Sequence, residues 1–66
     1  MRDKAILKRR SEILSRYPLM ADAAADLGMT PERLSRIVWG WVKPRPEEAR
    51  RMAWKLQTTI NELFPK

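Results

Sequence analysis

Apolar residues recur at three- and four-residue spacing along this chain, in short stretches separated by proline and glycine. That spacing predicts amphipathic helices, and no strand is expected between them. The first helix is expected from about residue 3 to residue 16, where good helix formers prevail, and it ends before Pro18 because a residue preceding proline disfavours the α region. Its apolar positions are Ile6, Leu7, Ile13 and Leu14.

The next two helices are predicted from their end signals. Residues 19–27 hold four alanines, which favour a thin helix, and Gly28 follows where a helix end needs positive φ. Thr30 then provides an N-cap, followed by Pro31 and an acid in the first turn. This third helix runs to Gly40 and turns Leu34, Ile37 and Val38 inward.

The remainder of the chain predicts a loop and two more helices. Residues 41–45 form the loop, and a fourth helix begins at Pro46 with two glutamates in its first turn. Its inward positions are Ala49, Met52, Ala53 and Leu56. Thr59 and Glu62 fit a capping box for a short fifth helix that buries Ile60, Leu63 and Phe64. The expected fold is all-α: one domain over residues 1–66, with five short helices around one core.

Composition excludes several classes of function. The chain has 66 residues with no cysteine and no histidine, so it lacks the usual general base and the commonest metal ligands. We therefore expect no enzyme, no metal site and no cofactor. Asp22 and Asp26 lie four residues apart, but with no third ligand they are expected to be exposed solubilising charges. No apolar run approaches the ~20 residues of a membrane span and no signal-peptide core is evident, so a cytoplasmic location is expected.

Charge points towards an anionic partner. Fourteen Lys and Arg against eight Asp and Glu give a net charge of +6. A positive surface gains affinity for nucleic acid by releasing counterions from phosphates. The same charge can also serve solubility alone, so it does not decide the function.

The segment from about residue 19 to residue 40 narrows the choice of function. It predicts two helices with a small residue, Ala24, where they cross, a glycine at the tight turn and a capped second helix, as in a helix-turn-helix unit. The run Ala23–Ile37 resembles the phage-repressor-like (Cro-type, xenobiotic-response-element or XRE) helix-turn-helix family. The likeness continues through Gly40, Lys43-Pro44, Met52-Ala53, Leu56 and residues 60–64, and so covers about residues 19–64.

The resemblance implies a five-helix, lambda-repressor-like domain that binds operator DNA and regulates transcription. Residues 30–39 would form the recognition helix in the major groove. The matching base-contacting positions are Pro31, Glu32, Arg33 and Arg36, with Arg36 favoured as the main reader. The matching phosphate-contacting positions are Thr30, Met20, Lys43 and Arg45. The basic run at residues 8–10 is a further candidate for phosphate contact.

Some positions depart from the family pattern. Met20 stands where the family often has a phosphate-binding glutamine, so only a backbone N–H would serve there. Val38 stands where the family often has a glutamate paired with an arginine of the first helix. Ile13 is expected to replace that arginine, which turns an ion pair into an apolar contact. Trp39 and Trp41 occupy places that are usually polar or basic.

Self-association is implied because one such domain reads only a few base pairs. We expect a homodimer on pseudo-palindromic double-stranded DNA, with Trp41, Trp54 or Phe64 as candidate interface residues. By analogy of size, the chain would be a repressor-type regulator of a phage, prophage or plasmid, or the antitoxin of a toxin–antitoxin pair. The alternative is a protein-interaction module or an antitoxin-type component that uses the same fold with weak or no DNA binding.

Overall fold

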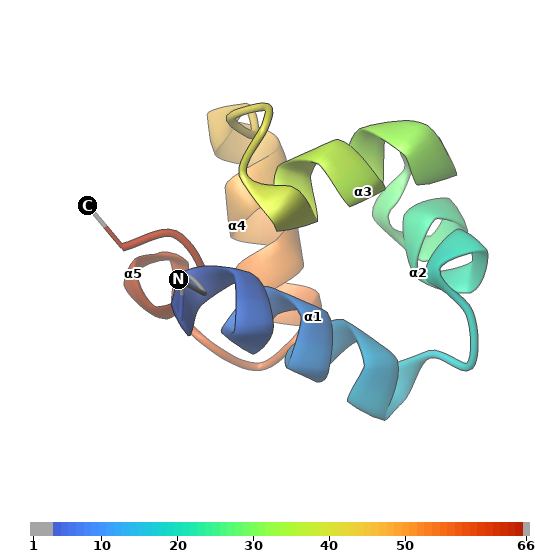
Figure 1. Cartoon of the computed structure of the whole chain (residues 1–66), viewed down its shortest axis with the longest axis horizontal. Coiled ribbons are helices and arrows are strands. Elements are labelled where there is room, and N and C mark those ends of the chain that lie inside the picture. Colours follow the sequence, from blue (N-terminus) through green and yellow to red (C-terminus); the bar gives the residue numbers. More distant parts are fainter. Residues whose placement is uncertain (1–3, 66) are drawn as a thin grey trace.

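The computed structural model describes residues 4–65, and within that range it is all-helical, with no strand (Figure 1). The predicted helices are all present, each within a residue or two of the expected ends. They are α1 (Lys4–Arg16), α2 (Met20–Leu27), α3 (Pro31–Trp39), α4 (Pro46–Lys55) and α5 (Ile60–Leu63). The all-α prediction is confirmed. Residue 3, the expected first residue of the first helix, lies outside the described range.

The helices surround one small core. α1 packs against α2, α3 and α5, while α4 packs against α2 and α5. All the inward positions predicted for α3 and α4 are buried, including Leu56 just past the end of α4. Ala23 and Ala24 of α2 are fully buried in this core, and α2 packs against α3.

Two glycines end helices as the sequence predicted. Gly28 (φ 74°) and Gly40 (φ 84°) both adopt the left-handed conformation that glycine tolerates best. At the end of α2, the N–H of Met29 donates to the carbonyl of Ala24 at 3.0 Å. At the end of α3, the N–H of Trp41 donates to the carbonyl of Arg36 at 2.9 Å. These Schellman motifs fix the turn between α2 and α3 and the exit from α3.

A third Schellman motif ends α4, and here the left-handed residue is Gln57 (φ 56°). The N–H of Thr58 donates to the carbonyl of Ala53 at 2.9 Å, as in the glycine-ended helices. This cap was not predicted, because glutamine is not a residue that marks the end of a helix. A side chain in this conformation is disfavoured by Cβ crowding.

Replacing Gln57 with glycine is therefore expected to stabilise the domain by about 0.5–1 kcal/mol, since it relieves that crowding. In a domain this small the change corresponds to a rise in Tm of roughly 3–6 °C in thermal unfolding. Gln57→Ala keeps the Cβ and is the matched control, with no gain expected. Equal Tm values for the two variants would contradict the assignment of strain to this position.

The apolar pattern was misleading at three positions. Leu7 and Leu14 of α1 are exposed, because the buried row of this helix is Ala5, Arg9 and Ile13. Ile60 is exposed as well, since only Leu63 of α5 enters the core and Phe64 is half-buried against it. The α5 cap also differs from a full capping box. Thr59 accepts from the N–H of Glu62 at 3.2 Å, but the Glu62 carboxylate accepts from the Thr58 hydroxyl instead.

Arg9 is the buried charge of the core, with 4% of its surface exposed. Its Nε donates to the carbonyl of Val38 at 3.0 Å, and its guanidinium donates to the carbonyl of Leu63 at 2.6 Å. One cation thus closes the ends of α3 and α5, where helix carbonyls lack partners and favour positive charge. Ile13 and Val38 do share the apolar core, as expected, but an arginine of the first helix still reaches Val38 through its backbone.

Asp26 ties separate parts of the fold together. Its carboxylate accepts from the Tyr17 hydroxyl at 2.5 Å and lies 3.5 Å from Nζ of Lys55. The hydrogen bond from Tyr17, followed by the charge of Lys55, lowers the pKa of Asp26 below its ordinary value. Asp26 therefore joins the link after α1 to the end of α4, a role beyond the solubilising one expected for it.

No helix within residues 4–65 is long and apolar enough to cross a membrane.

Candidate functional site

The outward face of α3 is the candidate site. Pro31, Glu32 and Arg36 are exposed on it and Ser35 is half-exposed, while Leu34, Ile37 and Val38 face the core. Met20 at the start of α2 and Trp41 after the end of α3 complete the lining of a shallow hollow of about 470 Å³ over this face. Residues predicted separately on two helices and a loop are thus brought together.

Hydrogen-bond donors remain available at the starts of α2 and α3. Thr30 caps α3, with its hydroxyl oxygen accepting from the N–H of Arg33 at 3.2 Å, so its hydroxyl hydrogen can still be donated. Leu19 precedes α2 and provides no side-chain cap. Within residues 4–65, no acceptor is found for the N–H groups of Met20 and Ala21 in its first turn. Such N–H groups are available to an anion.

Arg33 has a different environment from Arg36. Its guanidinium makes a two-pronged ion pair with Glu48 of α4, with Nε–Oε2 and Nη2–Oε1 distances of 2.8 and 2.7 Å. Glu48 also accepts from the N–H of Arg45, which caps the start of α4. This pair joins α3 to α4 and turns Arg33 towards the protein. Of the two arginines predicted to read bases, Arg33 therefore has a structural partner in the chain itself.

The bond from Arg33, reinforced by the backbone N–H of Arg45, lowers the pKa of Glu48 from 4.5 to about 2. A carboxylate whose pKa is depressed on folding contributes stability above its unfolded pKa, and that stability is lost as pH falls through the folded value. We expect the free energy of unfolding to fall between pH 4.5 and pH 2 as Glu48 is protonated. The expected loss is only about 1 kcal/mol, because solvent on the Arg33 side screens the pair.

Urea unfolding at a series of pH values measures this loss. Glu48→Gln keeps the shape of the side chain and removes its titration, so its stability should depend less on pH below 4.5 than that of the wild type. Glu47→Gln, one residue away on an exposed position, is the matched control. An identical acid response in wild type and Glu48→Gln would show that the ion pair adds no stability.

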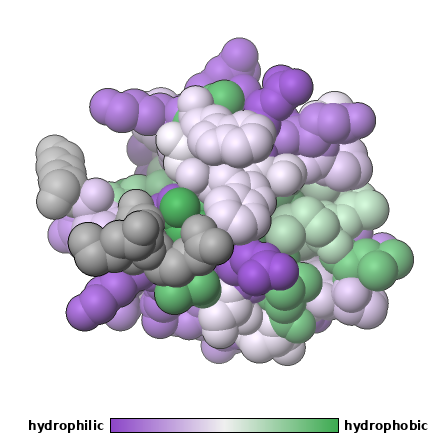
Figure 2. Space-filling view, in the orientation of Figure 1, coloured by the Kyte–Doolittle hydropathy of each residue, from purple (hydrophilic) through white to green (hydrophobic). Residues whose placement is uncertain are grey.

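The Lys and Arg side chains fall into two groups: those bonded within the protein and those available to an external partner. Lys8, Arg16, Arg33 and Lys55 pair with carboxylates, while Arg9 and Arg51 donate to carbonyls that end helices. Among residues 4–65, the cations whose side chains have no such partner are Lys4, Arg10, Arg36, Lys43, Arg45 and Arg50. Half of these lie on α3 and the loop that follows it. Figure 2 shows strongly hydrophilic side chains along the upper edge of the molecule, where Figure 1 places that loop and α3.

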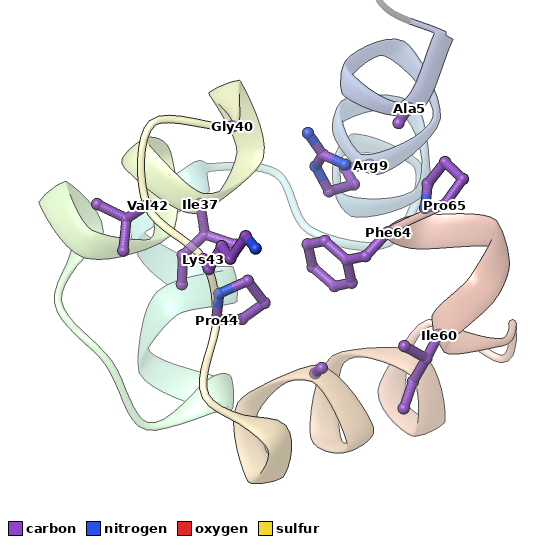
Figure 3. A pocket seen from close by; sticks show the side chains of 11 residues that line it. Ala5, Arg9, Ile37, Gly40, Val42, Lys43, Pro44, Ile60, Phe64 and Pro65 are labelled. Carbon is purple, nitrogen blue, oxygen red and sulfur yellow. The ribbon is translucent and has the colours of Figure 1, made fainter.

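A second groove, of about 780 Å³, lies between the loop on one side and α1 with the C-terminal segment on the other (Figure 3). Arg9 and Phe64 face each other within it, with the Arg9 guanidinium 5.1 Å from the centre of the ring. Lys43 and Pro44 form the opposite side. The expectation that the basic run 8–10 contacts phosphate does not suit Arg9, because this side chain is buried and bonded to the backbone.

The three candidate interface residues do not form one patch. Trp41 and Trp54 are 77% and 76% exposed, and Phe64 is half-buried. Trp41 lines the hollow on α3, Trp54 lines another at the end of α4, and Phe64 lines the groove beside Arg9. The three residues therefore belong to three separate hollows and do not define a single symmetric interface.

Comparisons with known proteins give no match. No protein-family model matches the sequence, and no curated protein or solved structure matches it either. Within residues 4–65, no group of three or more carboxylates could hold a metal ion. The site must therefore be interpreted from its own chemistry.

Two residues that shape the site were missed by sequence reasoning. Glu48 was seen only as an acid at the start of a helix, although it holds Arg33. Arg9 was seen only as part of a basic run. A usable signal for Arg9 was its spacing, since it falls between Ala5 and Ile13 on one helix face.

Proposed function

We propose that this protein is a sequence-specific double-stranded DNA-binding regulator, with α2 and α3 acting as a helix-turn-helix unit. α3 is the recognition helix and enters the major groove by its outward face. The observation that carries the proposal is the position of Arg36. It is an exposed cation on the outward face of α3, and its side chain has no partner among residues 4–65. Two further exposed cations, Lys43 and Arg45, follow in the loop after this helix.

The proposed docking separates reading from positioning. Arg36 donates to O6 and N7 of guanine, a contact worth about 1–3 kcal/mol of discrimination. Lys43 and Arg45 contact phosphates, together with the Thr30 hydroxyl and the free N–H groups at the start of α2. Arg33 is assigned to linking α3 to α4 through its side chain, because its guanidinium is already paired with Glu48. The base-contacting set is thereby reduced to Arg36 with Pro31 and Glu32 beside it.

Salt dependence tests the proposal. The association constant for a fluorescent duplex of random sequence should fall steeply with salt, with a log–log slope of about −0.9 for each phosphate contacted. Lys43→Ala should weaken binding to every duplex similarly and reduce the slope by about 1. Arg50→Ala removes an exposed α4 cation and is the matched control, with the slope unchanged.

Three exposed tryptophans, Trp39, Trp41 and Trp54, favour a second candidate, a protein-interaction module. It predicts no detectable binding to duplex DNA even at low salt. That result, with the chain folded by circular dichroism, would reject the DNA-binding proposal. A dimer on a pseudo-palindromic operator remains part of the first proposal, since one domain reads few base pairs.

A further inference from the structure

Trp41 is held on the candidate site by backbone geometry and not by the core. Its N–H donates to the carbonyl of Arg36, and Gly40 before it takes the positive φ that this turn requires. The indole is nevertheless 77% exposed. An exposed tryptophan on a fixed turn contributes little to folding, so its position is available for recognition.

The surroundings of Trp41 combine polar and charged side chains with two apolar residues. Its hollow is lined by Arg36, Met20 and Pro31, together with the polar residues Glu32 and Ser35. The major-groove edge of B-DNA presents hydrogen-bonding atoms and a single apolar group, the C5-methyl of thymine. A base step with guanine beside thymine offers both the acceptors that suit Arg36 and the methyl group that suits this apolar lining.

We propose that Trp41 is a specificity-determining residue that contacts the C5-methyl of a thymine adjacent to the guanine bound by Arg36. This inference rests on the proposed DNA-binding function and deepens it. It assigns Trp41 to the DNA surface, in place of the dimer interface for which the sequence alone made it a candidate. Burial of the methyl group against the indole supplies the preference, so cytosine and deoxyuridine at that position bind less well.

Deoxyuridine substitution tests the proposal because it removes only the methyl group. Duplexes selected by the wild-type chain from a random pool are remade with each thymine in turn replaced by deoxyuridine. One position next to the guanine should lose about fourfold in affinity, the effect expected for one buried methyl group. Trp41→Ala should bind the thymine and deoxyuridine duplexes equally, and Trp54→Ala, an equally exposed tryptophan elsewhere, should keep the difference.

The outcomes separate the two proposals. No binding to any duplex would overturn both. Arg36-dependent selection with no deoxyuridine effect at any position, or an effect that persists in Trp41→Ala, would leave the DNA-binding proposal standing and overturn this one. Trp41→Ala that changes only the oligomeric state would make Trp41 an interface residue, and would also overturn it.

Discussion

Replacing Arg36 with alanine is expected to remove sequence preference while leaving weak general DNA binding. Affinity for a selected duplex should fall about 5- to 150-fold, the range of one two-pronged arginine–guanine contact. Affinity for random-sequence duplex should fall by only a few fold, because Lys43 and Arg45 still contact phosphates. Fluorescence anisotropy with both duplexes measures the ratio.

Arg50→Ala is the control for Arg36→Ala, since it removes an exposed arginine from α4 that has no side-chain partner among the described residues. Both variants should unfold at the wild-type temperature. If Arg36→Ala kept the wild-type ratio between selected and random duplexes, the outward face of α3 would not be the reading surface.

Replacing Arg9 with methionine is expected to have the largest effect on stability, a loss of about 2–4 kcal/mol. The change removes the charge-assisted hydrogen bonds to the Val38 and Leu63 carbonyls and leaves these carbonyls without those donors. A domain of this length has a total stability of roughly 3–10 kcal/mol, so the variant should be partly unfolded at moderate temperature. Urea unfolding followed by circular dichroism measures the loss.

Arg10→Met is the matched control for Arg9, because the neighbouring arginine is exposed and has no side-chain partner among residues 4–65. Its stability should stay within about 0.5 kcal/mol of wild type. Equal stability of the two variants would contradict the role assigned to Arg9 in closing α3 and α5.

The predictable parts of this fold are those coded by neighbouring residues. Thr30, Gly28 and Gly40 act through atoms within one helical turn, so their residue types alone located the ends of α2 and α3. The inward row of α3 was predictable for the same reason, since its period is a property of one helix. The outward face of α3 was predictable as well, because it is the face opposite this buried row.

Contacts between distant residues were not predictable. Glu48 lies 15 residues from Arg33, and Arg9 lies 29 and 54 residues from Val38 and Leu63. No local pattern marks Glu48 as the partner of Arg33, so Arg33 was predicted to read DNA. The spacing of Arg9 places it on the buried face of α1 but does not identify its distant acceptors, and Arg9 was grouped with surface charge. Leu7 and Leu14 show the converse, as apolar residues that the packing of α1 leaves exposed.

Selection from a random pool of duplexes is the most direct test of the proposal that α3 reads DNA. The wild-type chain is predicted to enrich a motif containing guanine, repeated as a pseudo-palindrome with half-sites about one helical turn apart. Arg36→Ala is predicted to enrich no motif from the same pool, although it retains DNA at low salt. Failure of the wild type to enrich any sequence, or the same motif emerging with Arg36→Ala, would contradict this account.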